Sequence, residues 1–89
     1  MARTLLVGAE IACPTSVGTA TSFGGATVVR LVNTDTQARK VTLLEEQSGA
    51  GIGSMTMPAG SVEYLEKKST EVVLAADAKV LGTKVGYTG

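Results

Sequence analysis

The chain has 89 residues, of which 44% are hydrophobic and only 3% aromatic, and its eight Lys and Arg residues balance eight Asp and Glu residues. A chain of this length builds one hydrophobic core and therefore one domain. Because the net charge is zero and no basic run is interleaved with aromatic side chains, we predict no nucleic acid and no membrane as partner. No apolar run approaches the ~20 residues that a membrane-spanning helix needs.

Two residue types that carry much of enzyme chemistry are scarce. The chain contains no His, which removes the commonest general base and a common zinc ligand. Its one cysteine, Cys13, cannot form an intramolecular disulfide, so a cytoplasmic folding environment fits best, and we interpret it as a small hydrophobic residue or a free thiol. We therefore predict no catalytic residue, no metal ligand and no cofactor, and interpret the protein as a structural or binding module, not an enzyme.

The first quarter of the chain differs in composition from the rest. Thr4 to Ile11 is a short apolar run, interrupted by Glu10 and too short for the core of a signal peptide. The residues from Ala12 to Gly25 are mostly Thr, Ser, Gly and Ala. We interpret residues 1–25 as an N-terminal strand followed by an extended arm that contacts a neighbour through main-chain hydrogen bonds; a disordered loop is the alternative. On this interpretation, deleting Ala2 to Thr19 leaves the fold intact.

From Ala26 onward the sequence has the pattern of β-structure. Val28 to Val32 is almost continuously apolar, as in a central strand, and ends at a turn that begins with Asn33. Arg39 to Gln47 predicts a second strand, joined to the first as an antiparallel hairpin. A helix competes there, because Leu44 to Gln47 are good helix formers, but the segment lacks a capping box and a sustained helical period.

Further short strands are predicted at 52–57, 61–67, 71–74 and 79–87, with turn residues between them. Gly82 lies inside the last strand and is expected to mark a bulge or a close backbone approach. About seven short strands in all are typical of a small antiparallel β-sandwich or barrel, whose core we place in residues 26–89. An α+β fold with helices between Val62 and Leu81 is the alternative.

The acidic residues do not predict an acid–base site. Neighbouring residues of a strand point to opposite faces, as do residues three apart, so Glu45 cannot share a site with Glu46, nor Glu63 with Glu66. Asp35 and Asp77 lie in predicted turns, where Asp forms local hydrogen bonds. The glycine repeat from Gly49 to Gly53 lacks the strand–loop–helix context of a phosphate-binding loop, and we interpret it as a flexible hairpin loop.

Between Ala26 and Gly89 the sequence contains a characteristic series of features. In chain order these are a strand ending in Asn, a hairpin, an apolar-Pro turn ending in Gly-Ser, a Leu-Glu-Lys-Lys segment and a terminal strand. In this order the chain resembles a family of very small virion proteins of tailed bacteriophages, especially phages of cyanobacteria and other aquatic bacteria. The segments that carry the resemblance are Val29-Arg30-Leu31-Val32-Asn33, Lys40-Val41-Thr42-Leu43, Met57-Pro58-Ala59-Gly60-Ser61, Leu65-Glu66-Lys67-Lys68-Ser69-Thr70-Glu71 and Lys84-Val85-Gly86-Tyr87-Thr88.

The resemblance implies a structural protein of the virion, assembled in the host cytoplasm. More specifically, it implies a capsid cement (decoration) protein that stabilises the lattice of the major capsid protein. The small size agrees with this, because a single core stabilises such a chain by only about 4–13 kcal/mol, and association as a dimer or trimer or with a larger assembly would add to that. The alternatives are a neck or tail structural component and a soluble ligand-binding β module.

Overall fold

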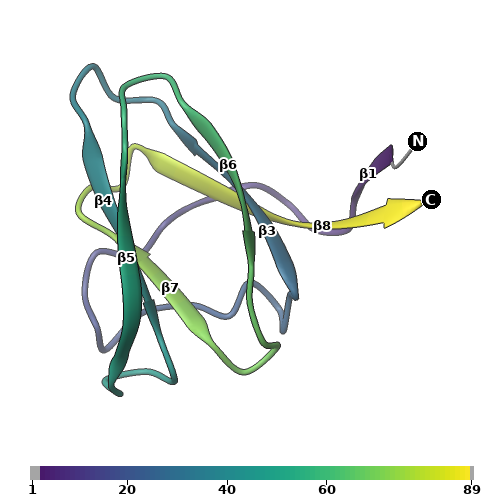
Figure 1. Cartoon of the computed structure of the whole chain (residues 1–89), viewed down its shortest axis with the longest axis horizontal. Helices are drawn as coiled ribbons and strands as arrows, with labels where there is room; N and C mark the ends of the chain where they lie inside the picture. The colour runs from purple at the N-terminus through teal and green to yellow at the C-terminus, as the bar shows by residue number, and fades with distance from the viewer. Residues whose placement is uncertain (1–2, 89) are drawn as a thin grey trace.

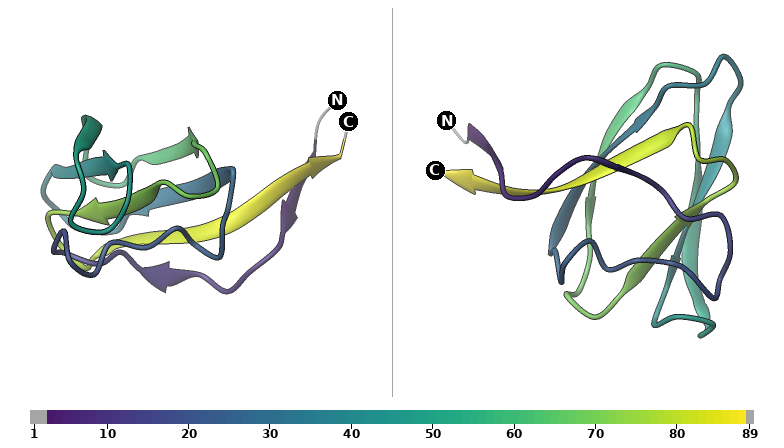
Figure 2. Two further views of the ribbon diagram at one scale, coloured as in Figure 1. Left: turned by 90° about the horizontal axis from the view of Figure 1, so that it is seen from below. Right: turned by 180° about the vertical axis from the view of Figure 1, so that it is seen from behind.

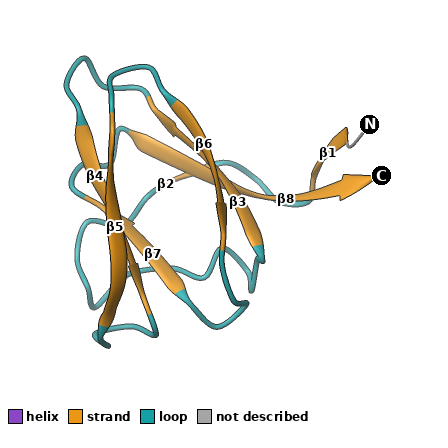
Figure 3. Ribbon diagram, viewed as in Figure 1, coloured by secondary structure: helices purple, strands orange, loops and turns teal. Residues whose placement is uncertain are grey.

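The protein is all-β. The computed structural model describes residues 3–88, and these form eight strands and no helix (Figure 1, Figure 3). The helical alternatives at Leu44–Gln47 and between Val62 and Leu81 are therefore wrong. The strands are β1 (Arg3–Leu6), β2 (Ile11–Ala12), β3 (Val28–Asn33), β4 (Arg39–Leu44), β5 (Gly51–Met57), β6 (Val62–Glu66), β7 (Val72–Ala75) and β8 (Val80–Thr88).

Two antiparallel sheets pack as the layers of a small sandwich, which confirms the predicted fold class. In the first sheet β3 lies between β6 and β8, and the far edge of β8 pairs with both β1 and β2. In the second sheet β4 lies between β5 and β7. In Figure 1 the strands β4, β5 and β7 form one side of the molecule and β3, β6 and β8 the other.

The predicted hairpin between β3 and β4 is wrong, because the two strands belong to different sheets. Both edges of β3 are occupied, one by β6 and the other by β8, so no place remains for β4. The side chain of the buried Asn33 stabilises the connection from β3 in one sheet to β4 in the other. Its Nδ2 donates to the carbonyl oxygens of Gln37 and Met57, both at 2.9 Å. The hairpin predicted around Gly49 does form, between β4 and β5.

The core lies between the sheets and is built mainly from aliphatic side chains. Strict alternation in β3 buries Val29, Leu31 and Asn33 and leaves their neighbours half-exposed. A smaller cluster lies on the outer face of the second sheet and contains Ala20, Leu44 and Val72, with Leu74 packed against it. Val85, which pairs with Leu6, is buried as well. The other core residues are Cys13, Phe23, Ala26, Val41, Met57, Val73, Ala75 and Val80.

The segment from Cys13 to Gly25, expected as an arm outside the core, packs on its own sandwich. Thr21 forms an antiparallel bridge with Val73, and the Ala75 N–H donates to the carbonyl oxygen of Pro14 at 2.9 Å. The segment therefore covers the free edge of β7 and supplies the fully buried Ala20. Its small residues allow the backbone to lie close against the sheet, so the core does not begin at Ala26.

Phe23 is the one large side chain that this segment adds to the core. Its φ of 53° lies in the left-handed region, which an aromatic residue rarely adopts, and the following Gly24 and Gly25 have φ of 67° and 72°. This turn lays the ring over Gly82, where a Cβ would lie 2.6 Å from the ring Cζ. The bulge or close backbone approach predicted for Gly82 is therefore wrong, because the atoms that crowd this position belong to the side chains of Phe23 and Leu31.

Candidate protein-interaction site

A two-stranded ribbon projects from the sandwich. β8 pairs with β3 as far as Lys84, and from Val85 to Thr88 its only paired strand among the described residues is β1. Both views in Figure 2 show β1 and the end of β8 leaving the body of the molecule together. An isolated two-stranded ribbon is marginal in water, so this element lacks the support that the other strands have.

The ribbon exposes apolar side chains on both of its faces. Leu5, Leu6 and Val7 have exposed fractions of 46%, 78% and 53%. Leu6 pairs with Val85 and Leu5 with Gly86, so the two leucines point to opposite faces. Adjacent exposed residues of this size on a projecting element are a feature of surfaces that bind another macromolecule.

The root of the ribbon is anchored to the sandwich by polar contacts. The Val7 N–H donates to the Lys84 carbonyl oxygen at 3.1 Å, and the Thr83 hydroxyl donates to the Gly8 carbonyl oxygen at 2.9 Å. Farther along, Arg30 and Glu10 form an ion pair at 3.5 Å. These contacts define the direction in which the ribbon leaves the sandwich.

A hollow flanks the root on each side. One has a volume of about 410 Å³ and the other about 450 Å³. The charged groups in them already have partners, since Lys84 donates to the Gly24 carbonyl oxygen and Arg30 pairs with Glu10. The first is lined by Val7, Gly8, Ala9, Ile11, Thr21, Phe23, Gly24 and Lys84, and the second by Thr4, Leu6, Gly8, Glu10, Arg30, Tyr64 and Thr83.

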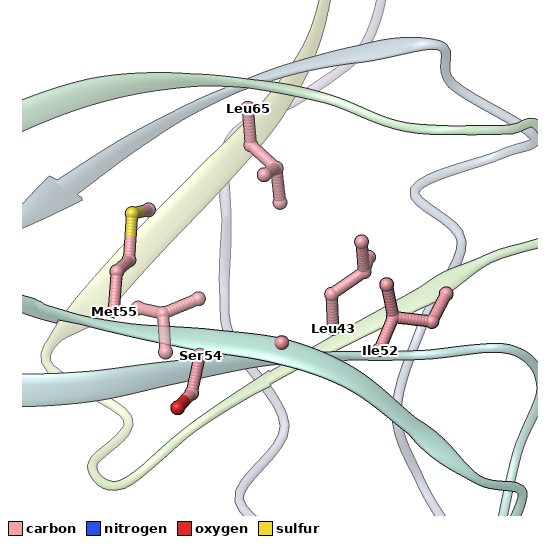
Figure 4. A pocket seen from close by; sticks show the side chains of 7 residues that line it. Leu43, Ile52, Ser54, Met55 and Leu65 are labelled. Carbon is pink, nitrogen blue, oxygen red and sulfur yellow. The ribbon is translucent and has the colours of Figure 1, made fainter.

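An apolar slot opens on the opposite side of the sandwich, between the edge strands β5 and β6. Figure 4 shows Leu65 of β6 facing Leu43, Ile52 and Met55 of the other sheet. The slot has a volume of about 210 Å³, below the roughly 300–1,000 Å³ of ordinary small-molecule sites. Its full lining is Val41, Leu43, Ile52, Gly53, Ser54, Met55 and Leu65.

Cys13, Asp35 and Asp77 are titratable residues that contribute to the core and the turns of the fold. Cys13 is buried, and desolvation raises the pKa of its thiol to about 11, so the thiol is protonated at neutral pH and is a poor nucleophile. Asp35 and Asp77 form the local hydrogen bonds expected of turn residues, and both also lie against Arg39, at 2.6 and 3.6 Å.

The acidic side chains do not group into a metal site within residues 3–88. Glu45 and Glu46 lie in the β4–β5 turn and not on a strand, because β4 ends at Leu44. No group of three His, Cys, Asp or Glu side chains in the described part of the chain could hold a metal ion. The described residues also contain no helix that could span a membrane.

The sequence pattern did not single out the ribbon or the slot. Leu5 to Val7 was included in the N-terminal strand, and nothing in the pattern indicated that its partner β8 extends beyond the sheet. The slot joins residues from three strands in two sheets, and the pairing of those strands was not predictable from periodicity. One signal was available for the ribbon: three consecutive apolar residues cannot all face one side of a strand.

Comparison with known proteins gave no match: no family model, no curated protein and no solved structure is significantly similar to the chain.

Proposed function

We propose that this protein is a non-enzymatic structural protein of a tailed-bacteriophage virion, most specifically a capsid cement protein that binds the lattice of the major capsid protein. The observation that carries the proposal is the projecting β1–β8 ribbon, whose Leu5, Leu6 and Val7 are exposed on two faces. A protein surface that encloses the ribbon would remove this apolar area from water. The phage assignment is supported by the resemblance of the sequence segments between Ala26 and Gly89 to small virion proteins.

The copy number in purified virions tests the proposal directly. A cement protein occurs in near-stoichiometric ratio to the major capsid protein, and quantitative mass spectrometry of particles measures that ratio. A low copy number would instead indicate a structural component of the neck or tail. Its absence from virions would contradict the proposal altogether.

The ribbon itself is tested with a substitution that does not disturb the core. Leu6→Ser removes a side chain that is 78% exposed, so the fold is retained. If a partner buries this side chain, about 1.5–3 kcal/mol of binding is lost, which lowers the affinity for particles about 10- to 150-fold. The matched control is Val17→Ser, since Val17 is 51% exposed and lies outside the ribbon. Equal binding of both variants would exclude the ribbon as the contact.

A soluble binding module is the second candidate, favoured by the hollow that contains Arg30, Glu10 and Tyr64 beside the ribbon. A module of this kind would bind a peptide or small polar ligand in solution, without particles. The virion measurement separates the two candidates, because only the structural protein is retained on purified particles.

A further inference from the structure

Apart from the projecting β1–β8 ribbon, the body of the sandwich has four sheet edges, and three of them are protected. β1 and β2 pair with the far edge of β8, and Thr21 and Pro14 cover the edge of β7. The edge strand β6 carries the exposed carboxylates of Glu63 and Glu66. Pairing, covering and charge are the means by which natural proteins prevent unwanted association at strand edges.

The fourth edge, β5, has none of these protections. Its sequence from Gly51 to Met57 contains no charged residue and no proline, and no strand within residues 3–88 pairs with its outer side. The apolar slot opens directly beside it. An uncharged edge beside an apolar slot is a site for the addition of another strand.

We propose that a second copy of this chain covers this edge, with the two β5 strands pairing antiparallel about a two-fold axis at Ser54. This goes beyond the proposed function and does not depend on it. A two-fold contact brings the same surface of both copies together, so the surface must be complementary to itself. The β5 edge is complementary to itself in both side-chain size and charge.

The side chains are complementary in size. Centred on Ser54, the pairing places Gly53 of one copy opposite Met55 of the other, on the inner face in each case, because both residues pair with slot-facing residues of β4. A Cβ at Gly53 would meet nothing within 4 Å, so this position has room for the flexible methionine of the second copy. The two slots then join into one apolar layer across the interface.

The charges are complementary as well. Lys40 is exposed at the beginning of β4 and pairs with Thr56, whereas Glu45 and Glu46 are exposed just beyond the other end of β4, where the Glu45 N–H donates to the Ala50 carbonyl oxygen. The hairpin is therefore basic at one end and acidic at the other. An antiparallel arrangement places the acidic end of each copy at the same end of the interface as the basic end of the other, about 14 Å away across the two β5 strands. At low ionic strength this attraction favours the antiparallel orientation over the parallel one.

Sedimentation velocity of the purified full chain at concentrations from about 1 μM to about 1 mM measures its oligomeric state. This range detects dimers with dissociation constants between about micromolar and millimolar. We expect a concentration-dependent dimer. Ser54→Lys brings two ammonium groups together at the axis and is expected to weaken the dimer at least about tenfold. Ser69→Lys makes the same change at an exposed turn position and leaves the dimer unchanged. A monomer over the whole range overturns the proposal, as does a dimer that Ser54→Lys does not weaken.

A cysteine cross-link tests the register without depending on how well the lysine variant folds. Residues directly opposite each other in antiparallel strands have Cα atoms about 4.5–5.5 Å apart, within the range of a disulfide. Ser54→Cys is therefore expected to form a covalent dimer under mild oxidation, whereas Ser69→Cys is not. Since Cys13 is buried, it is retained in both variants. Equal rates of cross-linking in the two variants overturn the proposal.

Discussion

The Asp35 carboxylate is the charged centre of the turn between β3 and β4. Arg39 Nε donates to its Oδ2 at 2.7 Å, the Thr36 N–H donates to its Oδ1 at 2.7 Å, and Lys79 Nζ lies 3.7 Å from Oδ1. The hydrogen bond from Arg39 is the main cause that holds the pKa of Asp35 below its usual value. The folded protein thus binds the proton of this carboxyl less readily than the unfolded chain does.

This shift predicts how stability depends on pH. A carboxyl with a lowered pKa in the folded state contributes stability above its unfolded pKa of about 4, and this contribution is lost as the pH falls through the folded pKa. Asp35→Asn should therefore unfold at a lower temperature than wild type at pH 7. We expect the difference in melting temperature to shrink steadily on acidification below about pH 4.

Thermal unfolding at a series of pH values from neutral to strongly acidic measures this difference. Asp77→Asn is the matched control, because Asp77 contacts the same Arg39 at 3.6 Å without the short hydrogen bond. The control should lower the melting temperature less at neutral pH. A difference between Asp35→Asn and wild type that is the same at every pH would contradict the linkage.

Asn33 illustrates what local sequence could and could not predict. The residue was correctly assigned to the end of a strand and the start of a turn, because Asn favours such positions. Its buried contact with the Met57 carbonyl oxygen was not predictable, since this contact depends on how the β3–β4 and β5–β6 turns meet in space. Local pattern located the turns, whereas the contacts between turns required the folded structure.

At the scale of elements, the contact between the Phe23 turn and β8 depends on a glycine. A Cβ at position 82 would lie 2.6 and 2.7 Å from two atoms of the Phe23 ring and 3.1 Å from Leu31 Cδ2. Gly82→Ala therefore forces the ring or the strand to move, at a cost of about 1–3 kcal/mol in unfolding free energy. Urea denaturation measures this loss.

A second substitution tests whether the ring is the cause. A leucine side chain is shorter than that of phenylalanine and has no atom at the position of the ring Cζ. Phe23→Leu should therefore recover part of the unfolding free energy that Gly82→Ala loses. We expect a coupling free energy of at least about 0.5 kcal/mol between the two substitutions in a double-mutant cycle. Strictly additive effects would show that another contact at Gly82 limits stability.

At the scale of the whole molecule, the positions of the strands were predictable and their pairing was not. Seven of the eight strands overlap a predicted segment that carries its own alternation or apolar run, and the two-residue β2 falls at the end of the first apolar run. The pairing is mostly between strands distant in sequence: β3 pairs with β6 and β8, and β1 with β8. Such pairings leave no local mark in the sequence, which is why β3 and β4 were wrongly expected to form a hairpin.

The same long-range pairing changes what an N-terminal deletion should do. The sequence indicated that Ala2 to Thr19 is dispensable for folding, but the structure divides this stretch into two parts. Residues 3–10 comprise β1, which pairs with the end of β8, and the root of the ribbon, which contacts the sandwich through the Val7–Lys84 and Gly8–Thr83 hydrogen bonds and the Glu10–Arg30 ion pair. Residues 11–19 contain β2, the buried Cys13 and the Pro14 carbonyl oxygen that accepts from Ala75.

Two nested deletions separate these parts. Removing residues 3–10 should lower the unfolding free energy by about 1–3 kcal/mol, because it loses a two-stranded ribbon that is itself marginal in water, the two hydrogen bonds at its root and one partly exposed ion pair. Removing residues 3–19 should cost at least about 3 kcal/mol more, since it empties the site of Cys13 and leaves the Ala75 N–H without its acceptor. Urea unfolding followed by far-UV circular dichroism measures both, as the chain has no Trp. Equal midpoints for the two deletions would mean that residues 11–19 add nothing to the core, and the N-terminal segment would then be the dispensable arm that its composition indicated.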